Sequence, residues 1–93
     1  MITMTTYRLK PFMSHDERRE LVALFMEHGT PGREIAHYMA ADNSYGVVIN
    51  ELDDAAEGFR NILNYIEHVE YETKVMVTIE EAMTHIGEVI SET

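Results

Sequence analysis

Two short apolar segments joined by a polar turn constrain the fold of this chain more than any other feature. Residues 35–40 and 47–52 are rich in β-branched and aromatic side chains, and residues 42–46 between them read DNSYG. Asn and Gly tolerate positive φ angles, and Asp and Ser side chains hydrogen-bond to nearby backbone groups. The pattern predicts a β-hairpin that forms locally and offers a sheet for the flanking segments to join.

The segments outside the hairpin predict two further strands. Residues 2–9 alternate side chains on two faces, and Pro11 soon afterwards lacks the N–H that would continue a ladder. Residues 69–77 alternate Val, Tyr and Thr with Glu, Lys and Met. A period of two residues is typical of a strand with two different faces.

Three helices are predicted from capping residues followed by apolar positions with helical spacing. A capping box places Ser, Thr or Asp three residues before Glu, so that each side chain satisfies a backbone N–H near the helix start. The pairs with this spacing are Ser14 and Glu17, Asp54 and Glu57, and Thr78 and Glu81. Gly29, followed by Thr-Pro-Gly, ends the first helix.

The predicted order is strand, helix, two strands, helix, strand and a C-terminal helix. Right-handed crossovers make this a ferredoxin-like α+β fold, with four antiparallel strands and two helices on one face. The opposite face still carries Val, Tyr, Met and Ile, which would leave a contiguous apolar patch on a monomer. We therefore expect a single domain, residues 1–93, that forms a homodimer through this face and encloses a cavity as a dimeric α/β barrel.

Three short motifs carry a resemblance to known proteins. Residues 4–7 read MTTY, residues 41–46 read ADNSYG, and residues 51–55 read ELDDA. With them the chain resembles the dimeric α/β-barrel superfamily and is similar to a small uncharacterised family within it. That family often has Trp before the turn, where Tyr38 is nearest in this chain. The superfamily includes cofactor-free monooxygenases, polyketide cyclases, haem-binding and haem-degrading enzymes, muconolactone-type isomerases and proteins without known catalysis, so the resemblance implies a fold and no single activity.

Composition narrows the classes of partner. The formal net charge of −10 argues against nucleic acid, because phosphate binding needs clustered Lys and Arg. The absence of Cys excludes disulfides, a thiolate nucleophile and Cys-based zinc sites. No apolar run approaches the roughly 18 residues of a membrane span, and no signal-peptide pattern is present. We expect a cytoplasmic protein with neither nucleic acid nor membrane as partner.

Polar side chains on apolar strands are the candidates for chemistry. We predict His37 as a general acid or base, because imidazole titrates near neutral pH. Asn50 is predicted to donate to a developing enolate or phenolate oxygen, and Tyr7 to donate or accept a hydrogen bond in the same network. This set suits proton abstraction from an acidic phenolic or β-dicarbonyl substrate, with cyclisation, isomerisation or reaction with oxygen to follow.

Tyr38, Tyr71 and Met76 are the predicted substrate-binding residues. Because side chains alternate along a strand, His37 and Tyr38 point to opposite faces, and at most one of them lines a given cavity. Packing in the core or at the dimer interface is the alternative role of the tyrosines.

Metal binding has weak support in the sequence. His68 is close in sequence to Glu67, Glu70 and Glu72, but this spacing matches no known metal motif. We predict neither a metal site nor a dedicated cofactor.

Two functions remain open from the sequence. One is a small-molecule enzyme acting on an aromatic or polyketide-like substrate in the barrel cavity. The other is a non-catalytic dimeric module that binds a ligand or a partner protein. An open cavity containing His37 favours the enzyme, and a closed interior filled by Val, Met and Tyr favours the module.

Overall fold

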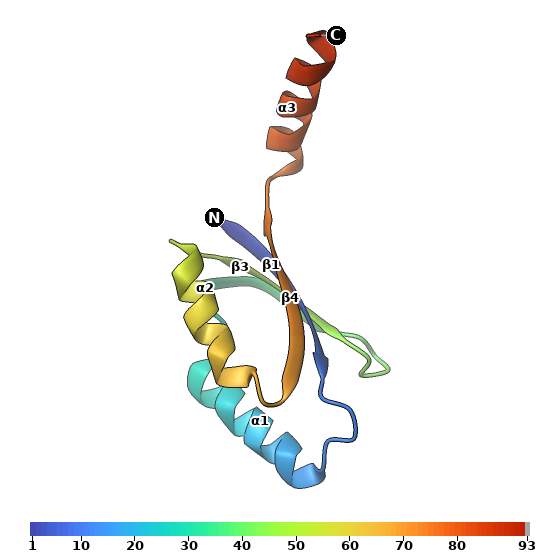
Figure 1. The fold of residues 1–93 in the computed structure, drawn as a ribbon, viewed down its shortest axis with the longest axis vertical. Coiled ribbons are helices and arrows are strands. Elements are labelled where there is room, and N and C mark those ends of the chain that lie inside the picture. The colour runs from blue at the N-terminus through green and yellow to red at the C-terminus, as the bar shows by residue number, and fades with distance from the viewer. Residues whose placement is uncertain (93) are drawn as a thin grey trace.

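A computed structural model describes residues 1–92 as an α+β fold, and Thr93, the last residue of the expected domain, lies outside the described residues (Figure 1). The strands are β1 (Ile2–Leu9), β2 (Arg33–Met39), β3 (Gly46–Glu51) and β4 (Val69–Met76). The helices are α1 (His15–His28), α2 (Ala55–Ile62), the short 3₁₀ turn η1 (Leu63–Tyr65) and α3 (Ile79–Ser91).

The strands pair antiparallel in the order β2-β3-β1-β4, which is the ferredoxin-like arrangement predicted from the sequence. β1 and β3 lie in the centre of the sheet, and β2 and β4 form its edges. Both α1 and α2 lie on the same side of the sheet (Figure 1).

The predicted hairpin is confirmed as β2 and β3. β2 begins two residues before the predicted apolar segment, and β3 begins one residue before its predicted segment. The Ala40 N–H donates to the Tyr45 carbonyl oxygen at 2.8 Å, which closes the loop. Asn43 takes a positive φ of 65°, and the Ser44 N–H donates to the Asp42 carboxylate at 3.0 Å. The turn therefore uses the residue chemistry from which it was predicted.

Helix capping also follows the sequence, with one shift. Ser14 and Glu17 form the complete capping box of α1, with bonds of 3.1 and 3.4 Å. At α2 the Asp54 carboxylate accepts from the Glu57 N–H at 2.9 Å. The Glu57 side chain, however, accepts from the Asp53 N–H at 3.2 Å, one residue before the partner expected of a capping box.

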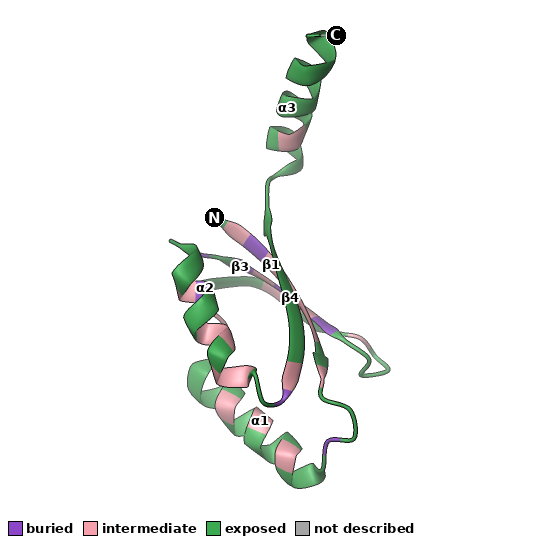
Figure 2. Ribbon diagram, viewed as in Figure 1, coloured by how far each residue is buried: buried purple, intermediate pink, exposed green. Residues whose placement is uncertain are grey.

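The core is small. Among the described residues, the buried apolar side chains are Met13, Val48 and Leu52 (Figure 2). Gly58 lets α2 approach the sheet closely, because a Cβ at this position would lie 3.0 Å from a methyl carbon of Leu52. Most of the apolar side chains on α1 and α2 stay partly exposed (Figure 2).

Thr78 caps the start of α3, where its hydroxyl accepts from the Glu81 N–H at 3.1 Å. The helix extends away from the sheet and from α1 and α2 (Figure 1). The described chain is consequently long and open. Its radius of gyration is 16.4 Å, against about 12 Å for a compact domain of this length. Its accessible surface is 6965 Å², roughly 1,500 Å² more than expected for a compact monomer of this mass. None of the helices in residues 1–92 is long and apolar enough to span a membrane.

The capping box of α1 gives a first prediction. We expect Ser14→Ala to lower the free energy of unfolding by about 1 kcal/mol, because an N–H at the helix start loses its acceptor. Urea unfolding measures this loss. Ser14→Thr is the matched control, because Thr keeps a hydroxyl acceptor and retains most of the stability. Equal losses in the two variants would show that the cap does not stabilise α1.

Candidate functional site

A cavity of about 330 Å³ lies between the sheet and the two helices that cover it. Side chains from one face of all four strands line it, together with side chains from α1 and α2. Leu21, Phe25, Val48 and Ile62 contribute to a wall that is mostly apolar. In such a cavity the few polar side chains that reach a ligand fix its orientation, so each of them is important for recognition.

Tyr7 and His37 line this cavity, and a chain of hydrogen bonds joins them to Glu34 behind it. The Tyr7 hydroxyl lies 2.5 Å from Nε2 of His37, and Nδ1 of His37 lies 3.1 Å from the Glu34 carboxylate. A carboxylate can only accept, so in the neutral imidazole Nδ1 carries the proton and Nε2 accepts from the Tyr7 O–H. The Phe25 ring also packs edge-on against His37, with 5.7 Å between ring centroids.

The chain continues to two further residues behind Glu34. The Thr30 hydroxyl donates to the same Glu34 oxygen at 3.1 Å, and the Asn50 side-chain amide donates to the Thr30 oxygen at 3.1 Å. Asn50 is 1% exposed, so its amide is held inside the fold. Asn50 therefore connects to His37 through Thr30 and Glu34 and does not itself line the cavity.

An irregularity in β2 brings Glu34 and His37 to one face of the sheet. In a regular strand, residues three apart point to opposite faces. Here Glu34 pairs with Asn50. Ala36, two residues later in β2, pairs with Ile49, which is only one residue away from Asn50 in β3, so the register shifts by one residue. This β-bulge reverses the alternation between the two side chains. Glu34 was not predicted as a site residue, because regular alternation separates it from His37.

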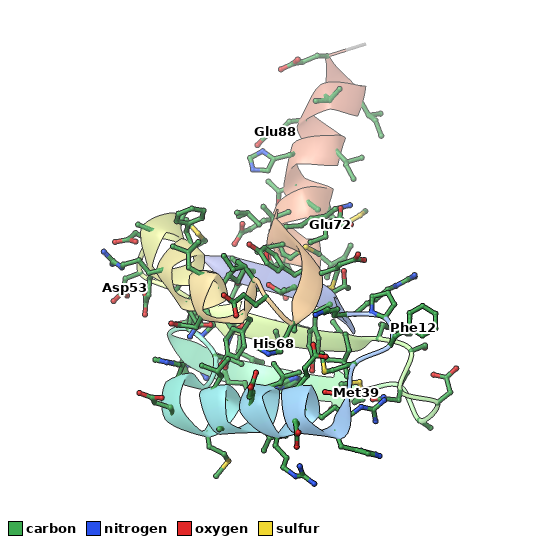
Figure 3. All side chains as sticks on the ribbon, turned by 60° about the horizontal axis from the view of Figure 1, so that its bottom comes forward. Phe12, Met39, Asp53, His68, Glu72 and Glu88 are labelled. Carbon is green, nitrogen blue, oxygen red and sulfur yellow. The ribbon has the colours of Figure 1, made fainter. Side chains whose placement is uncertain are left out.

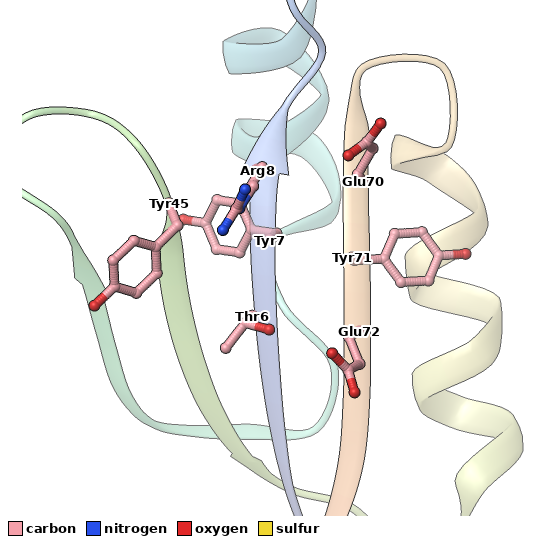
Figure 4. A pocket seen from close by; sticks show the side chains of 7 residues that line it. All are labelled: Thr6, Tyr7, Arg8, Tyr45, Glu70, Tyr71 and Glu72. Carbon is pink, nitrogen blue, oxygen red and sulfur yellow. The ribbon is translucent and has the colours of Figure 1, made fainter.

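Gly46 provides the space through which Tyr7 reaches His37. In the sheet Gly46 of β3 pairs with Tyr7 of β1 on one side and with Met39 of β2 on the other. The Tyr7 ring lies over the start of β3, close to Tyr45 (Figure 4). A Cβ at Gly46 would overlap this ring, so only glycine leaves Tyr7 room to cross toward β2.

The environment of Tyr7 favours its neutral form. Burial raises the pKa of the Tyr7 phenol above its usual value of 10.0, and the negative charge of Glu34 raises this pKa further. Tyr7 therefore keeps its proton at neutral pH and acts as a hydrogen-bond donor. Together, the three residues can pass a proton between the cavity and the His37 imidazole, with the Glu34 carboxylate stabilising the imidazolium that forms.

The structure separates the other predicted site residues into two groups. Tyr71 lines the same cavity as Tyr7 and His37. Tyr38 and Met76 lie on the opposite face of the sheet and are exposed. The expected opposition of His37 and Tyr38 is therefore observed, and only His37 reaches the cavity.

An open depression of about 470 Å³ lies on the helix-free face, between β1 and β4. Arg8, Glu70 and Glu72 project there together with Thr6, while the rings of Tyr7 and Tyr71 turn away to either side (Figure 4). Its charged groups are exposed to solvent, where interactions between charges are weak. Tyr7 borders both spaces, but its hydroxyl meets His37 on the cavity side, so we place the candidate site in the cavity.

His68 is buried away from the cavity, between α1 and the start of β4 (Figure 3). Its Nε2 lies 3.3 Å from the Glu20 carboxylate, and its Nδ1 has no hydrogen-bond partner within the described residues. In residues 1–92 no group of three or more His, Cys, Asp or Glu side chains is arranged to hold a metal ion.

Comparisons with known proteins add no further constraint. No protein-family model matches the chain, and no curated protein matches its sequence. The geometry of the cavity and its hydrogen-bond chain is therefore what points to a function.

The close approach at Gly46 gives a second prediction. We expect Gly46→Ala to destabilise the protein by about 1–3 kcal/mol, because the added methyl group displaces the Tyr7 ring. Urea unfolding measures the change. Gly87→Ala is the control, because no atom lies within 4 Å of a Cβ there, and Ala in a helix is favoured by up to about 1 kcal/mol. A Gly46→Ala protein as stable as the parent would contradict the crossing of Tyr7 over β3.

The raised pKa of Tyr7 gives a third prediction. The folded protein holds this proton more tightly than the unfolded chain, so the phenol contributes stability below pH 10 that is lost as pH rises through its folded pKa. Tyr7→Phe should therefore reduce the fall in stability above pH 10. Urea unfolding below and above this pH measures the slope. Tyr38→Phe, on the opposite face, should leave the slope unchanged, and the same slope in all three proteins would contradict the prediction.

Proposed function

We propose that the cavity is the site of a small-molecule enzyme without a dedicated cofactor, which removes a proton from an acidic phenolic or β-dicarbonyl group of an aromatic or polyketide-like substrate. The observation that carries the proposal is a hydrogen-bond chain that begins at Tyr7 and His37, in the wall of an apolar cavity, and ends at Glu34. A general base, a carboxylate that orients it and a neutral hydroxyl that relays the proton from the substrate to the base are parts that proton abstraction can use.

In the proposed reaction, the Tyr7 oxygen accepts the substrate proton while the Tyr7 proton passes to Nε2 of His37. The electron pair left on the substrate spreads over an enolate or phenolate. The imidazolium is stabilised by the Glu34 carboxylate at Nδ1. The proton returns along the same path when the product forms, so the site is restored. Cyclisation, isomerisation or reaction with oxygen proceeds from the enolate or phenolate.

Other residues would orient the Glu34 carboxylate and the bound substrate. Asn50 holds Thr30, and Thr30 fixes the Glu34 carboxylate that orients His37. Asn50 is in this proposal a positioning residue. Tyr71 borders the cavity and offers a ring surface on which an aromatic substrate can pack.

The proposal includes a homodimer formed through the helix-free face of the sheet, as in a dimeric α/β barrel. Ile2, Met4, Val47 and Ile49 form the apolar centre of this face, and Tyr38 beside them is 69% exposed. Burying this surface against a second copy is favoured by the hydrophobic effect.

A non-catalytic dimeric module is the second candidate function. The observation that favours it is the amount of apolar surface left exposed on the helices, which is typical of a protein that binds a partner. In this case the cavity binds a small molecule, or stays empty, without turnover.

Deuterium exchange gives a fourth prediction and separates the two functions. Benzoylacetone, an aromatic β-dicarbonyl compound, loses and regains its acidic C–H proton without any later step. We expect the protein in D₂O to accelerate this exchange, measured by NMR, and His37→Ala to lower the protein-dependent rate by about 100-fold or more. His85→Ala, an exposed histidine on α3, is the matched control and should keep the full rate.

Thermal shift in the same samples completes the test. A ligand that binds the folded state raises Tm. A rise in Tm without accelerated exchange would overturn the catalytic proposal and support the binding module. Exchange that is equal in folded His37→Ala and in the parent protein would remove His37 from the reaction.

A further inference from the structure

α3 carries an apolar face that the isolated chain leaves in water. Ile79, Met83, Ile86 and Val89 are between 48% and 74% exposed, and no residue of α3 is buried. Their spacing places them on one side of the helix, with Glu80, Glu81 and Glu88 on the other. A helix of 13 residues is marginally stable alone in water, so this face needs a surface to pack against.

A matching apolar surface lies along α2 and η1. Gly58, Ile62 and Tyr65 line the cavity, and the Tyr65 hydroxyl and the Asn61 amide bond to the carbonyl oxygen of Gly29 at the end of α1. The opposite flank of the helix, turned away from α1, carries three exposed apolar side chains. They are Phe59, Leu63 and Ile66, and they are 46–63% exposed.

β4 continues this surface at the edge of the sheet. Tyr71 and Val75 lie on the face of β4 that α1 and α2 cover, and both are exposed. We call Phe59, Leu63, Ile66, Tyr71 and Val75 the α2–β4 strip. Tyr71 belongs both to this strip and to the wall of the cavity. A helix packed on the strip would therefore cover the β4 side of the cavity.

The direction of α3 indicates that a second copy supplies this helix. Val77 and Thr78 are the only residues between β4 and α3, and Thr78 is extended, with φ −66° and ψ 156°. α3 thus continues away from its own strip (Figure 1). The roughly 1,500 Å² of surface beyond that of a compact monomer exceeds the roughly 800 Å² that each partner buries in a standard interface. Exchange of an identical element between two copies is a low-cost route to such a dimer.

We propose that α3 is exchanged between two copies of this chain, with Ile79, Met83, Ile86 and Val89 packing on the α2–β4 strip of the other copy and closing its cavity. The helix is about 20 Å long, which suits the combined length of α2 and η1. The inference rests on the proposed homodimer in requiring a second copy, and it adds a contact that makes each cavity incomplete without the partner.

Crosslinking tests where α3 docks, and the chain offers a clean background because it has no cysteine. Full-length Met83→Cys and full-length, ¹⁵N-labelled Leu63→Cys are unfolded together, refolded and treated with a short thiol-reactive crosslinker. Mass spectrometry of the covalent dimer should show position 83 joined to position 63 of the other copy. The control pairs Met83→Cys with Tyr38→Cys on the helix-free face.

Three results of this experiment would overturn the exchange of α3. The first is a link from position 83 to position 38 in place of position 63. The second is a Met83→Cys/Leu63→Cys double variant that crosslinks only within one chain, because the helix then folds back on its own strip. The third is a dimer without either link, which would leave the sheet-face homodimer standing and remove the exchange alone.

Sedimentation equilibrium provides an independent measurement on matched variants. Ile86→Glu and Thr84→Glu each add one negative charge to α3, the first on its apolar face and the second on its polar face. We expect Ile86→Glu to weaken dimerisation at least tenfold and Thr84→Glu to change it less than about twofold. Equal effects in the two variants, or a parent chain that is monomeric at micromolar concentration, would overturn the inference.

Discussion

The register of β2, β3 and β1 determines where the side chains of the candidate site lie. Gly46 pairs with both neighbouring strands, so the Tyr7 ring can cross the middle strand without meeting a side chain. Beyond it, His37 lies opposite Val48 and presents Nε2 to the Tyr7 hydroxyl. A shift of one residue in either pairing would turn one of these side chains to the other face. The site therefore depends on backbone hydrogen bonds as much as on its own polar contacts.

Much of the fold could be predicted from the sequence because its signals are local. The capping box at Ser14, the turn before Gly46 and the alternation that separates His37 from Tyr38 each depend on residues close in the chain. The site could be predicted only in part. Contact between Tyr7 and His37 depends on a pairing of distant strands that alternation alone does not fix. The apolar spacing of α3 likewise predicts an amphipathic helix without indicating any surface for it to pack against.

The cavity and the small core are two aspects of one arrangement. Space that apolar side chains would fill in a compact domain is left open between the sheet and its helices, so few residues are buried. Such a domain gains less from the hydrophobic effect than a filled one, and contact with a second copy can offset the difference. The open interior and the proposed homodimer would thus have the same physical origin in this chain.

The β-bulge in β2 has a consequence for how such a site arises and disappears. Glu34 and His37 share a face only because β2 contains one residue more than the segment of β3 that it pairs with. Loss of that single residue would keep the strand, the hairpin and the sheet, yet it would turn the carboxylate outward and leave the imidazole without its orienting partner. Descendants of one ancestor could therefore differ in chemistry through a single codon deletion while every side chain of the network remained in the sequence.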